Sequence, residues 1–346
     1  MDLLSFIRKA PKAELHTHID GALRIDTVLD MAKKHHISLP SYDYDILKDI
    51  LTIDNNCKSL VEYFKPYEYT LSILQTEDAI ERTMYEFLED SKNDHIIYSE
   101  ARFSPALHLK QGLSLQKVMD AILRGKKQAE KDFHIKSGII VCGLRTFDDQ
   151  TNNELAQLAV DYKNKGVVAF DLAGAELGHP AKKHIKAFEI AKCNNLCRTV
   201  HAGEADGAHS IADAIHYLGA QRIGHGTHLY EDTDLLNYVR DRQIALEVCL
   251  TSNMQTKSVS NLKEHPIKDY FQSSIAVTIN TDSTLISGIQ LSKEYELAVK
   301  LFGFNQADIE KIMLNGFEQA FLPFDEKQDL IKEVKDHWQT LHSSLK

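Results

Sequence analysis

Short apolar runs alternate with helical segments along most of this chain of 346 residues. We predict eight strands from these runs, at 13–20, 95–105, 138–145, 166–174, 197–203, 222–226, 244–251 and 275–282. Several runs are almost continuously apolar, as in Gly138-Ile-Ile-Val-Cys142, which is typical of parallel strands covered by helices on both faces. Eight strand–helix units in one chain predict an α/β fold, a closed (β/α)8 TIM barrel rather than an open doubly wound sheet.

The stretch between the first two predicted strands breaks this rhythm. Residues 24–92 have mainly helical periodicity, in segments at 24–36, 58–75 and 76–92. An insertion after the first strand of a barrel lies at the catalytic mouth, so we expect a helical lid there. Three extra helical segments follow the last strand, and we expect residues 1–346 to form a single domain because no composition shift or low-complexity tract divides them.

Charge and composition exclude several classes of partner. The formal net charge is −10, which argues against nucleic acid, because phosphate contacts need clustered Lys and Arg. No apolar run is long enough for a signal peptide or a membrane span, and the five cysteines are scattered. We therefore expect a cytoplasmic protein with reduced thiols, no membrane partner and no disulfide framework.

Two histidines near the start form a candidate metal site. His16 and His18 stand in the run Leu15-His-Thr-His-Ile-Asp-Gly21. If this run is a strand, side chains two residues apart share a face, so His16, His18 and Asp20 point the same way. Two converging imidazoles suit a divalent metal, usually zinc, although histidines can also satisfy hydrogen bonds in a protein core.

Other predicted strands also end in polar residues that could complete such a site. These residues are Asp171, His201, Glu204, His225 and Asp282. Because the carboxyl ends of barrel strands meet at one face, we expect these side chains to lie close together. Three histidines and one aspartate form a ligand set for a catalytic zinc ion that leaves room for a water molecule.

Six motifs in these places resemble those of one family. They are PKAELHTHIDG at 11–21, FDLAGAE at 170–176, VHAGE at 200–204, RIGHGTH at 222–228, CLTSN at 249–253 and INTD at 279–282. In this order, and spanning almost the whole chain, they resemble the adenosine deaminases of the metal-dependent amidohydrolase superfamily. The resemblance implies a (β/α)8 barrel, one zinc ion per chain, and hydrolytic deamination of adenosine and 2′-deoxyadenosine in purine salvage.

The resemblance also implies roles for matching residues. It assigns four residues to zinc: His16, His18, His201 and Asp282. Glu204 would donate a proton to N1 of the purine, and His225 would orient or deprotonate the attacking water. Gly174 would offer its backbone amide to N3, while Asp20 and partly His18 would lie near the ribose, Asp20 bonding the 5′-hydroxyl.

Two of these roles are supported by physical arguments. An aromatic purine resists attack at C6 until N1 is protonated, and a buried Glu204 would have the raised pKa that a proton donor needs. A glycine at 174 lets the purine edge approach the backbone without a Cβ in the way. Relatives that act on free adenine carry Glu where this chain has Asp20, which favours a nucleoside substrate.

The chain departs from the family pattern directly after the metal aspartate. The family usually has a second acid there, followed by proline, and that acid contacts N7 of the purine; this chain has Asp282-Ser283-Thr284. Ser283 can still donate a hydrogen bond to N7, but its shorter side chain leaves a gap. We therefore expect a deaminase whose recognition of the base is weakened or shifted.

Some expectations rest on less specific patterns. Leu60, Val61 and Phe64 match a helix that forms an apolar gate over the pocket in this family, although they could equally pack a helix onto the barrel. Arg102 and Glu176 fall inside motifs as supporting residues. The alternatives left open are a different 6-aminopurine nucleoside, such as a 5′-modified adenosine, or a nucleoside-binding protein without turnover; the oligomeric state is undetermined.

Overall fold

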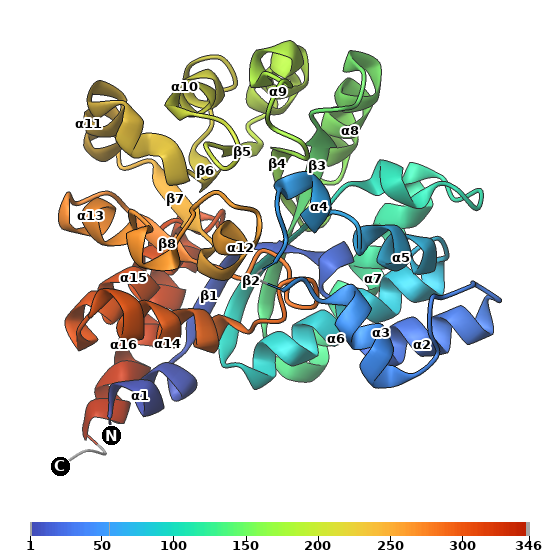
Figure 1. Cartoon of the computed structure of the whole chain (residues 1–346), viewed down its shortest axis with the longest axis horizontal. Coiled ribbons are helices and arrows are strands. Elements are labelled where there is room, and N and C mark those ends of the chain that lie inside the picture. The colour runs from blue at the N-terminus through green and yellow to red at the C-terminus, as the bar shows by residue number, and fades with distance from the viewer. Residues whose placement is uncertain (1, 55, 344–346) are drawn as a thin grey trace.

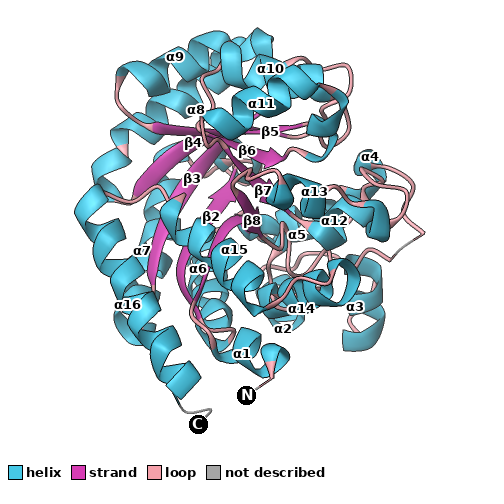
Figure 2. Ribbon diagram, turned by 90° about the vertical axis from the view of Figure 1, so that its left-hand side faces the viewer, coloured by secondary structure: helices cyan, strands magenta, loops and turns pink. Residues whose placement is uncertain are grey.

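Eight parallel strands form a barrel that helices surround, in a computed structural model that describes residues 2–54 and 56–343. The strands follow one another around the barrel in chain order, and Figure 2 shows them inside the layer of helices. They are β1 (Lys12–His18), β2 (Ile96–Phe103), β3 (Lys136–Leu144), β4 (Val167–Ala173), β5 (Cys197–Ala202), β6 (Arg222–His225), β7 (Ala245–Val248) and β8 (Val277–Ile279).

The barrel closes between β8 and β1 through backbone hydrogen bonds of Asp282, which follows β8. The His18 N–H donates to the Asp282 carbonyl at 2.7 Å, and the Asp282 N–H donates to the His16 carbonyl at 2.9 Å. Asp282 is therefore held in the wall of the barrel beside both histidines. The predicted (β/α)8 barrel is confirmed.

The outer helices pack the apolar faces that the strands turn outward. Ile139 and Val141 of β3 are fully buried, for example, as are Leu155 and Ala156 on the helix that follows. The helices after β2 through β8 are α7 (Leu115–Phe133), α8 (Asp149–Asp161), α9 (Ile185–Cys193), α10 (Ala208–His216), α11 (Thr233–Asp241), α12 (Leu250–Gln255), α13 (Ile267–Gln272), α14 (Leu291–Phe302), α15 (Gln306–Glu318) and α16 (Phe324–Ser343).

The insertion between β1 and β2 is helical, and it lies on the right of the barrel in Figure 1. It contains α2 (Ile25–Lys34), α3 (Tyr44–Leu51), α4 (Leu60–Tyr63), α5 (Tyr67–Ile73) and α6 (Glu77–Asn93). The helix predicted at 58–75 is divided in two, with Pro66 between α4 and α5.

Two strand boundaries were predicted wrongly, and two helices were missed. The first strand ends at His18 and Ile19–Gly21 is a 3-10 turn, so Asp20 does not share a strand face with the histidines. The seventh strand ends at Val248 because α12 begins at Leu250. Sequence patterns also missed α1 (Leu3–Lys9) and α3, whose first turn is capped by the Asp43 side chain accepting from the Ile46 N–H.

Within the described part of the chain, no helix is both long enough and apolar enough to cross a membrane.

Candidate metal centre and active site

Four predicted ligands converge at the carboxyl ends of three strands. His16, His18, His201 and Asp282 each offer one ligand atom, and all four atoms lie within 4.8 Å of one another. The His18 and His201 Nε2 atoms are 3.0 Å apart, and Asp282 Oδ1 lies 3.4 Å from His16 Nε2. The His16 Nε2 atom is buried without a hydrogen-bond partner among the described residues. Such an orphaned acceptor inside a three-histidine, one-carboxylate set fits a divalent metal such as zinc.

A buried glutamate orients the first of these histidines. Glu247 on β7 accepts from His16 Nδ1 at 2.7 Å, which leaves Nε2 free to face the cluster. Arg102 and Arg222 also donate to Glu247, at 2.8 and 2.7 Å. Burial alone would raise the pKa of Glu247, but the two guanidinium groups outweigh it and hold that pKa well below its usual range. Glu247 is therefore an ionised anchor inside the barrel.

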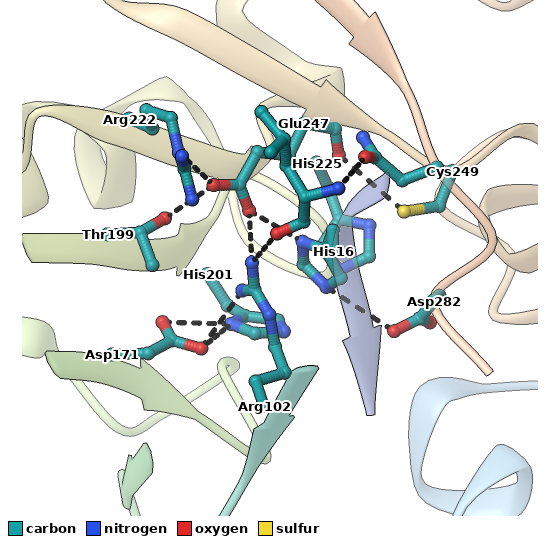
Figure 3. Close-up of polar contacts among 12 residues, drawn as sticks. His16, Arg102, Asp171, Thr199, His201, Arg222, His225, Glu247, Cys249 and Asp282 are labelled. Carbon is teal, nitrogen blue, oxygen red and sulfur yellow. Dashed lines mark hydrogen bonds and ion pairs between the residues drawn. The ribbon is translucent and has the colours of Figure 1, made fainter. Parts of the chain in front are cut away.

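Arg102 connects this anchor to a second one, as Figure 3 shows. Its Nη1 donates to Asp171 at 3.1 Å, and Asp171 lies 3.0 Å from His201 Nδ1. Burial would raise the pKa of Asp171, but His201 and Arg102 lower it below its usual range. As in His16, the contact at Nδ1 leaves Nε2 of His201 free to face the cluster. On the fourth ligand, the Ser252 hydroxyl donates to Asp282 Oδ2 at 2.6 Å.

A chain of hydrogen bonds fixes the tautomer of His225. The Ile267 N–H donates to His265 Nδ1 at 3.1 Å, so the proton of neutral His265 is on Nε2 and is donated to Asn253 Oδ1 at 3.1 Å. The amide nitrogen of Asn253 then donates to His225 Nδ1 at 3.0 Å. The proton of neutral His225 is consequently on Nε2, which lies 3.6 Å from Glu204 Oε2.

Both histidines of this series of hydrogen bonds, His265 and His225, are neutral near pH 7. Burial lowers the pKa of His265 to about 3, and burial together with nearby His16 holds the pKa of His225 well below its usual range. His225 also has a left-handed backbone, with φ of 62°, as does Asp282, with φ of 65°. Residues other than glycine seldom adopt this conformation, and such positions cluster at functional sites.

Glu204 lies in a turn that another carboxylate organises. Glu176 accepts from the backbone N–H groups of four successive residues, 203 to 206, at 2.6 to 3.1 Å. The side chain of Glu204 is 4% exposed, and its Oε1 has no partner among the described residues. Burial raises the pKa of Glu204 well above its usual range, and the charges of Asp282 and Glu176 raise it further. Burial therefore favours the protonated form of Glu204.

One cavity of about 40 Å³ is lined by Glu204, by His225 and by three members of the cluster, His18, His201 and Asp282. Gly174 lines it too, with φ of +93°, a conformation that favours glycine. Asp20 is 4% exposed, and its Oδ1 is unpartnered within the described residues; burial raises its pKa to about 7. A volume of this size holds about one water molecule. A purine nucleoside is several times larger, so the cavity must open to admit one.

Helices α4 and α5 cover the cavity with a different set of side chains from that expected. Leu60 and Phe64 line it as predicted, but Val61 is 68% exposed and lies outside the lining. Tyr63, the last residue of α4, and Tyr67, the first residue of α5, line it as well. The structure places Ser283 in a fully buried position, bonded to the Tyr67 hydroxyl.

Sequence reasoning missed several supporting residues. Glu247 stands inside the apolar run Ile244-Ala-Leu-Glu-Val248, and a carboxylate in a strand buried on both faces was the available signal. Asn253 and Ser252 fall in the CLTSN motif but were given no role. Arg102 and Glu176, expected as supporting residues, are both buried and contact the site as described above.

Comparisons with known proteins agree with this geometry. The sequence model of the adenosine deaminase family matches residues 11–337. The chain is 39% identical over 351 residues to the adenosine deaminase of Mycobacterium marinum, covering 96% of each protein. It is 44% identical over 319 residues to a probable adenosine deaminase of Dictyostelium discoideum, covering 92% of this chain but 41% of that longer protein. This chain belongs to the adenosine deaminase family.

A solved structure shares the fold. The adenine deaminase from Arthrobacter aurescens superposes with a TM-score of 0.89 at 25% identity, covering 95% of this chain and 99% of the other. That structural relative is named for the free base adenine rather than for the nucleoside.

Proposed function

We propose that this protein catalyses the hydrolytic deamination of adenosine and 2′-deoxyadenosine to inosine and 2′-deoxyinosine, with release of ammonia. The observation that carries the proposal is that the buried carboxyl group of Glu204 shares a cavity with three members of a four-residue cluster that could hold a metal ion. Membership of the adenosine deaminase family supports it.

We propose that His16, His18, His201 and Asp282 hold one zinc ion. When bound, zinc lowers the pKa of a coordinated water to about 7 and so supplies a nucleophile near neutral pH. The outer anchors Glu247 and Asp171 would keep the two buried imidazoles turned toward the ion.

Glu204 and His225, whose side chains approach to 3.6 Å, would act on the purine ring and on the attacking water, respectively. Glu204 transfers its proton to N1, which makes C6 electrophilic, and burial keeps that proton in place until substrate binds. His225 presents an N–H at Nε2, so in the resting state this nitrogen donates a hydrogen bond to the attacking water and orients it. Of the two roles open for His225 at the sequence level, the structure supports orientation.

Gly174 and Asp20 would position the nucleoside. The backbone amide of Gly174 would donate to N3, and the unpartnered oxygen of Asp20 would accept the 5′-hydroxyl of the ribose. The part of the insertion at 24–92 that holds α4 and α5 would serve as a lid on a single-domain barrel of residues 1–346. We expect the lid to move when substrate binds, because the cavity is smaller than a purine nucleoside.

The test is turnover of a substrate panel by the wild type and by Glu204→Gln, followed by ultraviolet absorbance with zinc content measured on the same samples. Glutamine keeps the size of the side chain but cannot give up a proton, so kcat on adenosine should fall about a thousandfold while zinc content is unchanged. Glu189→Gln, on the exposed face of α9, is the matched control and should keep wild-type turnover.

Four outcomes would contradict the proposal. Near wild-type turnover by Glu204→Gln would show that Glu204 is not the proton donor. Full activity after the metal is stripped would show that the reaction does not need zinc. Preference for adenine or for a 5′-modified adenosine over adenosine would show that adenosine is not the substrate. Tight binding of adenosine without formation of inosine, in zinc-replete protein, would indicate a binding protein instead.

A further inference from the structure

Two neutral hydroxyl groups meet beside the cavity, on a part of its wall that the proposed mechanism does not use. The Tyr67 hydroxyl, at the start of α5, is hydrogen-bonded to the Ser283 hydroxyl directly after Asp282. Gly21, at the end of the turn after β1, makes this contact possible. A Cβ added at Gly21 would lie 2.5 Å from the Tyr67 oxygen and 2.6 Å from the Ser283 oxygen, so alanine there would displace both groups.

Only one partner of this pair faces the cavity. Ser283 is fully buried, whereas Tyr67 lines the cavity together with Glu204, His225 and Asp282. Two hydroxyl groups that share one hydrogen bond have one further proton to donate. If the Ser283 O–H donates to the tyrosine oxygen, the Tyr67 O–H is free to donate to a ligand.

The tyrosine can act as a donor throughout the neutral pH range. Burial raises its pKa well above the ordinary value, and the neighbouring Tyr63, Asp282 and Asp20 raise it further. A neutral donor also avoids placing another charge beside the carboxylates of Asp282 and Asp20. This side of the cavity therefore suits a neutral acceptor on the ligand.

The connectivity of a purine determines which acceptor lies there. C6 is bonded to N1 on one side and to C5, which carries N7, on the other. When N1 faces Glu204 after β5, N7 faces the opposite side of the cavity, toward the residues that follow β8 and β1. Those residues include Ser283 and Gly21, against which the Tyr67 hydroxyl is packed.

We propose that Tyr67 is a specificity-determining residue whose hydroxyl donates a hydrogen bond to N7 of the purine, and that Ser283 positions it. This inference rests on the proposed function, because the orientation of the ring comes from the Glu204–N1 contact. It moves the N7 contact from Ser283, where the sequence suggested it, to a residue of the insertion.

The test uses adenosine and 7-deazaadenosine, in which a C–H group replaces N7. For Tyr67→Phe, kcat/KM on adenosine should fall about tenfold, whereas the inhibition constant of 7-deazaadenosine should stay within about twofold of the wild-type value. Ser283→Ala should show the same selective pattern with a smaller loss, about threefold, because it only frees the tyrosine to rotate.

Two tyrosines of the same segment serve as controls. Tyr63→Phe removes a lid hydroxyl bonded to Ser287 rather than to the ligand, so any effect should be equal for the two nucleosides. Tyr69→Phe, on α5 but outside the cavity lining, should change neither constant.

The proposal is overturned if Tyr67→Phe impairs the use of adenosine and the binding of 7-deazaadenosine equally, which would mean that the hydroxyl only holds the lid. It is also overturned if the substitution changes neither constant. Failure of the proposed function is seen separately, as a wild-type protein that forms no inosine. In that case equilibrium dissociation constants of the two compounds, measured with the same variants, decide whether Tyr67 contacts N7.

Discussion

The two sides of the active-site cavity are built from different chemistry. Beneath the metal ligands, Arg102, Asp171, Arg222 and Glu247 form a buried ionic network in which each side chain is at most 1% exposed. Above the cavity, α4 and α5 contact the segment after β8 through neutral hydroxyl pairs, Tyr63 with Ser287 at 2.7 Å and Tyr67 with Ser283. One side is charged and inside the barrel, and the other is neutral and on an insertion.

This difference separates the reaction from recognition. Breaking a buried ion pair costs about 3–5 kcal/mol, so the ionic network holds the metal ligands in one arrangement. Losing a neutral hydrogen bond costs about 0.5–1.5 kcal/mol, so either hydroxyl pair can separate at a lower cost than the ionic network. The lid side can therefore change its partners at low cost while the metal side stays fixed.

The largest expected effect comes from the ionic side. Glu247→Gln leaves Arg102 and Arg222 without their shared anion, so we expect the free energy of unfolding to fall by about 3–5 kcal/mol and the metal affinity to fall about 10–100-fold. Denaturant titration and metal titration measure the two losses. Glu89→Gln, which breaks the part-exposed ion pair with Arg24, should cost less than about 1 kcal/mol. Equal losses in the two variants would show that the buried network contributes no more to stability than an ion pair near the surface.

A second buried glutamate sharpens this comparison because it is held by hydroxyl and amide groups rather than by arginine. Glu294 of α14 is bonded to the backbone N–H and hydroxyl of Thr251, and burial raises its pKa from 4.5 to about 7. Between pH 4.5 and pH 7, Glu294 stays protonated in the folded protein but ionises in the unfolded chain. The contribution of Glu294 to the free energy of unfolding therefore falls as the pH rises from 4.5 to 7.

Glu294→Gln should remove this loss. Relative to wild type, the variant should gain up to about 3 kcal/mol in unfolding free energy between pH 4.5 and pH 7.5, measured by denaturant titration at both values. A difference between variant and wild type that is the same at both pH values would show that Glu294 is ionised in the fold.

The third prediction concerns the series of hydrogen bonds that fixes the tautomer of His225. An aspartate at 253 cannot donate to His225 Nδ1 and instead favours a proton there, so Asn253→Asp should reduce kcat about thirtyfold, change KM little and shift the pH dependence of kcat. Steady-state kinetics across pH measure all three. The exposed Asn194→Asp is the control and should have no effect. An unchanged pH profile would mean that Asn253 does not set the protonation of His225.

The smallest expected effect is on the lid side. Tyr63→Phe removes one neutral hydrogen bond to Ser287, so the free energy of unfolding should fall by about 1 kcal/mol and kcat/KM by less than about threefold. Thermal unfolding and steady-state kinetics measure these values. A loss as large as that for Glu247→Gln would show that the lid is as rigidly held as the metal side.

The sequence predicted the barrel and the convergence of the four ligands because both follow from periodicity. The apolar runs and their helical spacers specify eight strand–helix units, and strand ends in a barrel share one face. His16, His18, His201 and Asp282 could be chosen on that basis. By contrast, Asp20 was assigned to a strand that ends two residues earlier, because sequence patterns locate element boundaries poorly.

The remaining parts of the site depend on contacts between distant segments. Val61 was expected over the cavity and Tyr67 was not, because Pro66 divides the helix and only the packed structure shows which side of each half faces the barrel. Glu247 is 231 residues away from the His16 that it orients. No local pattern in an apolar strand indicates which histidine its single carboxylate will meet.

The sequence by itself therefore determined the fold, the family and the set of chemically competent residues, since periodicity and motif spacing are local properties of the chain. Tertiary structure decided three further features: which nitrogen of each histidine faces the site, which buried carboxyl groups have a raised pKa, and which side chains of α4 and α5 line the cavity. These depend on burial and on hydrogen-bond partners supplied by other strands, and both arise only when the barrel closes.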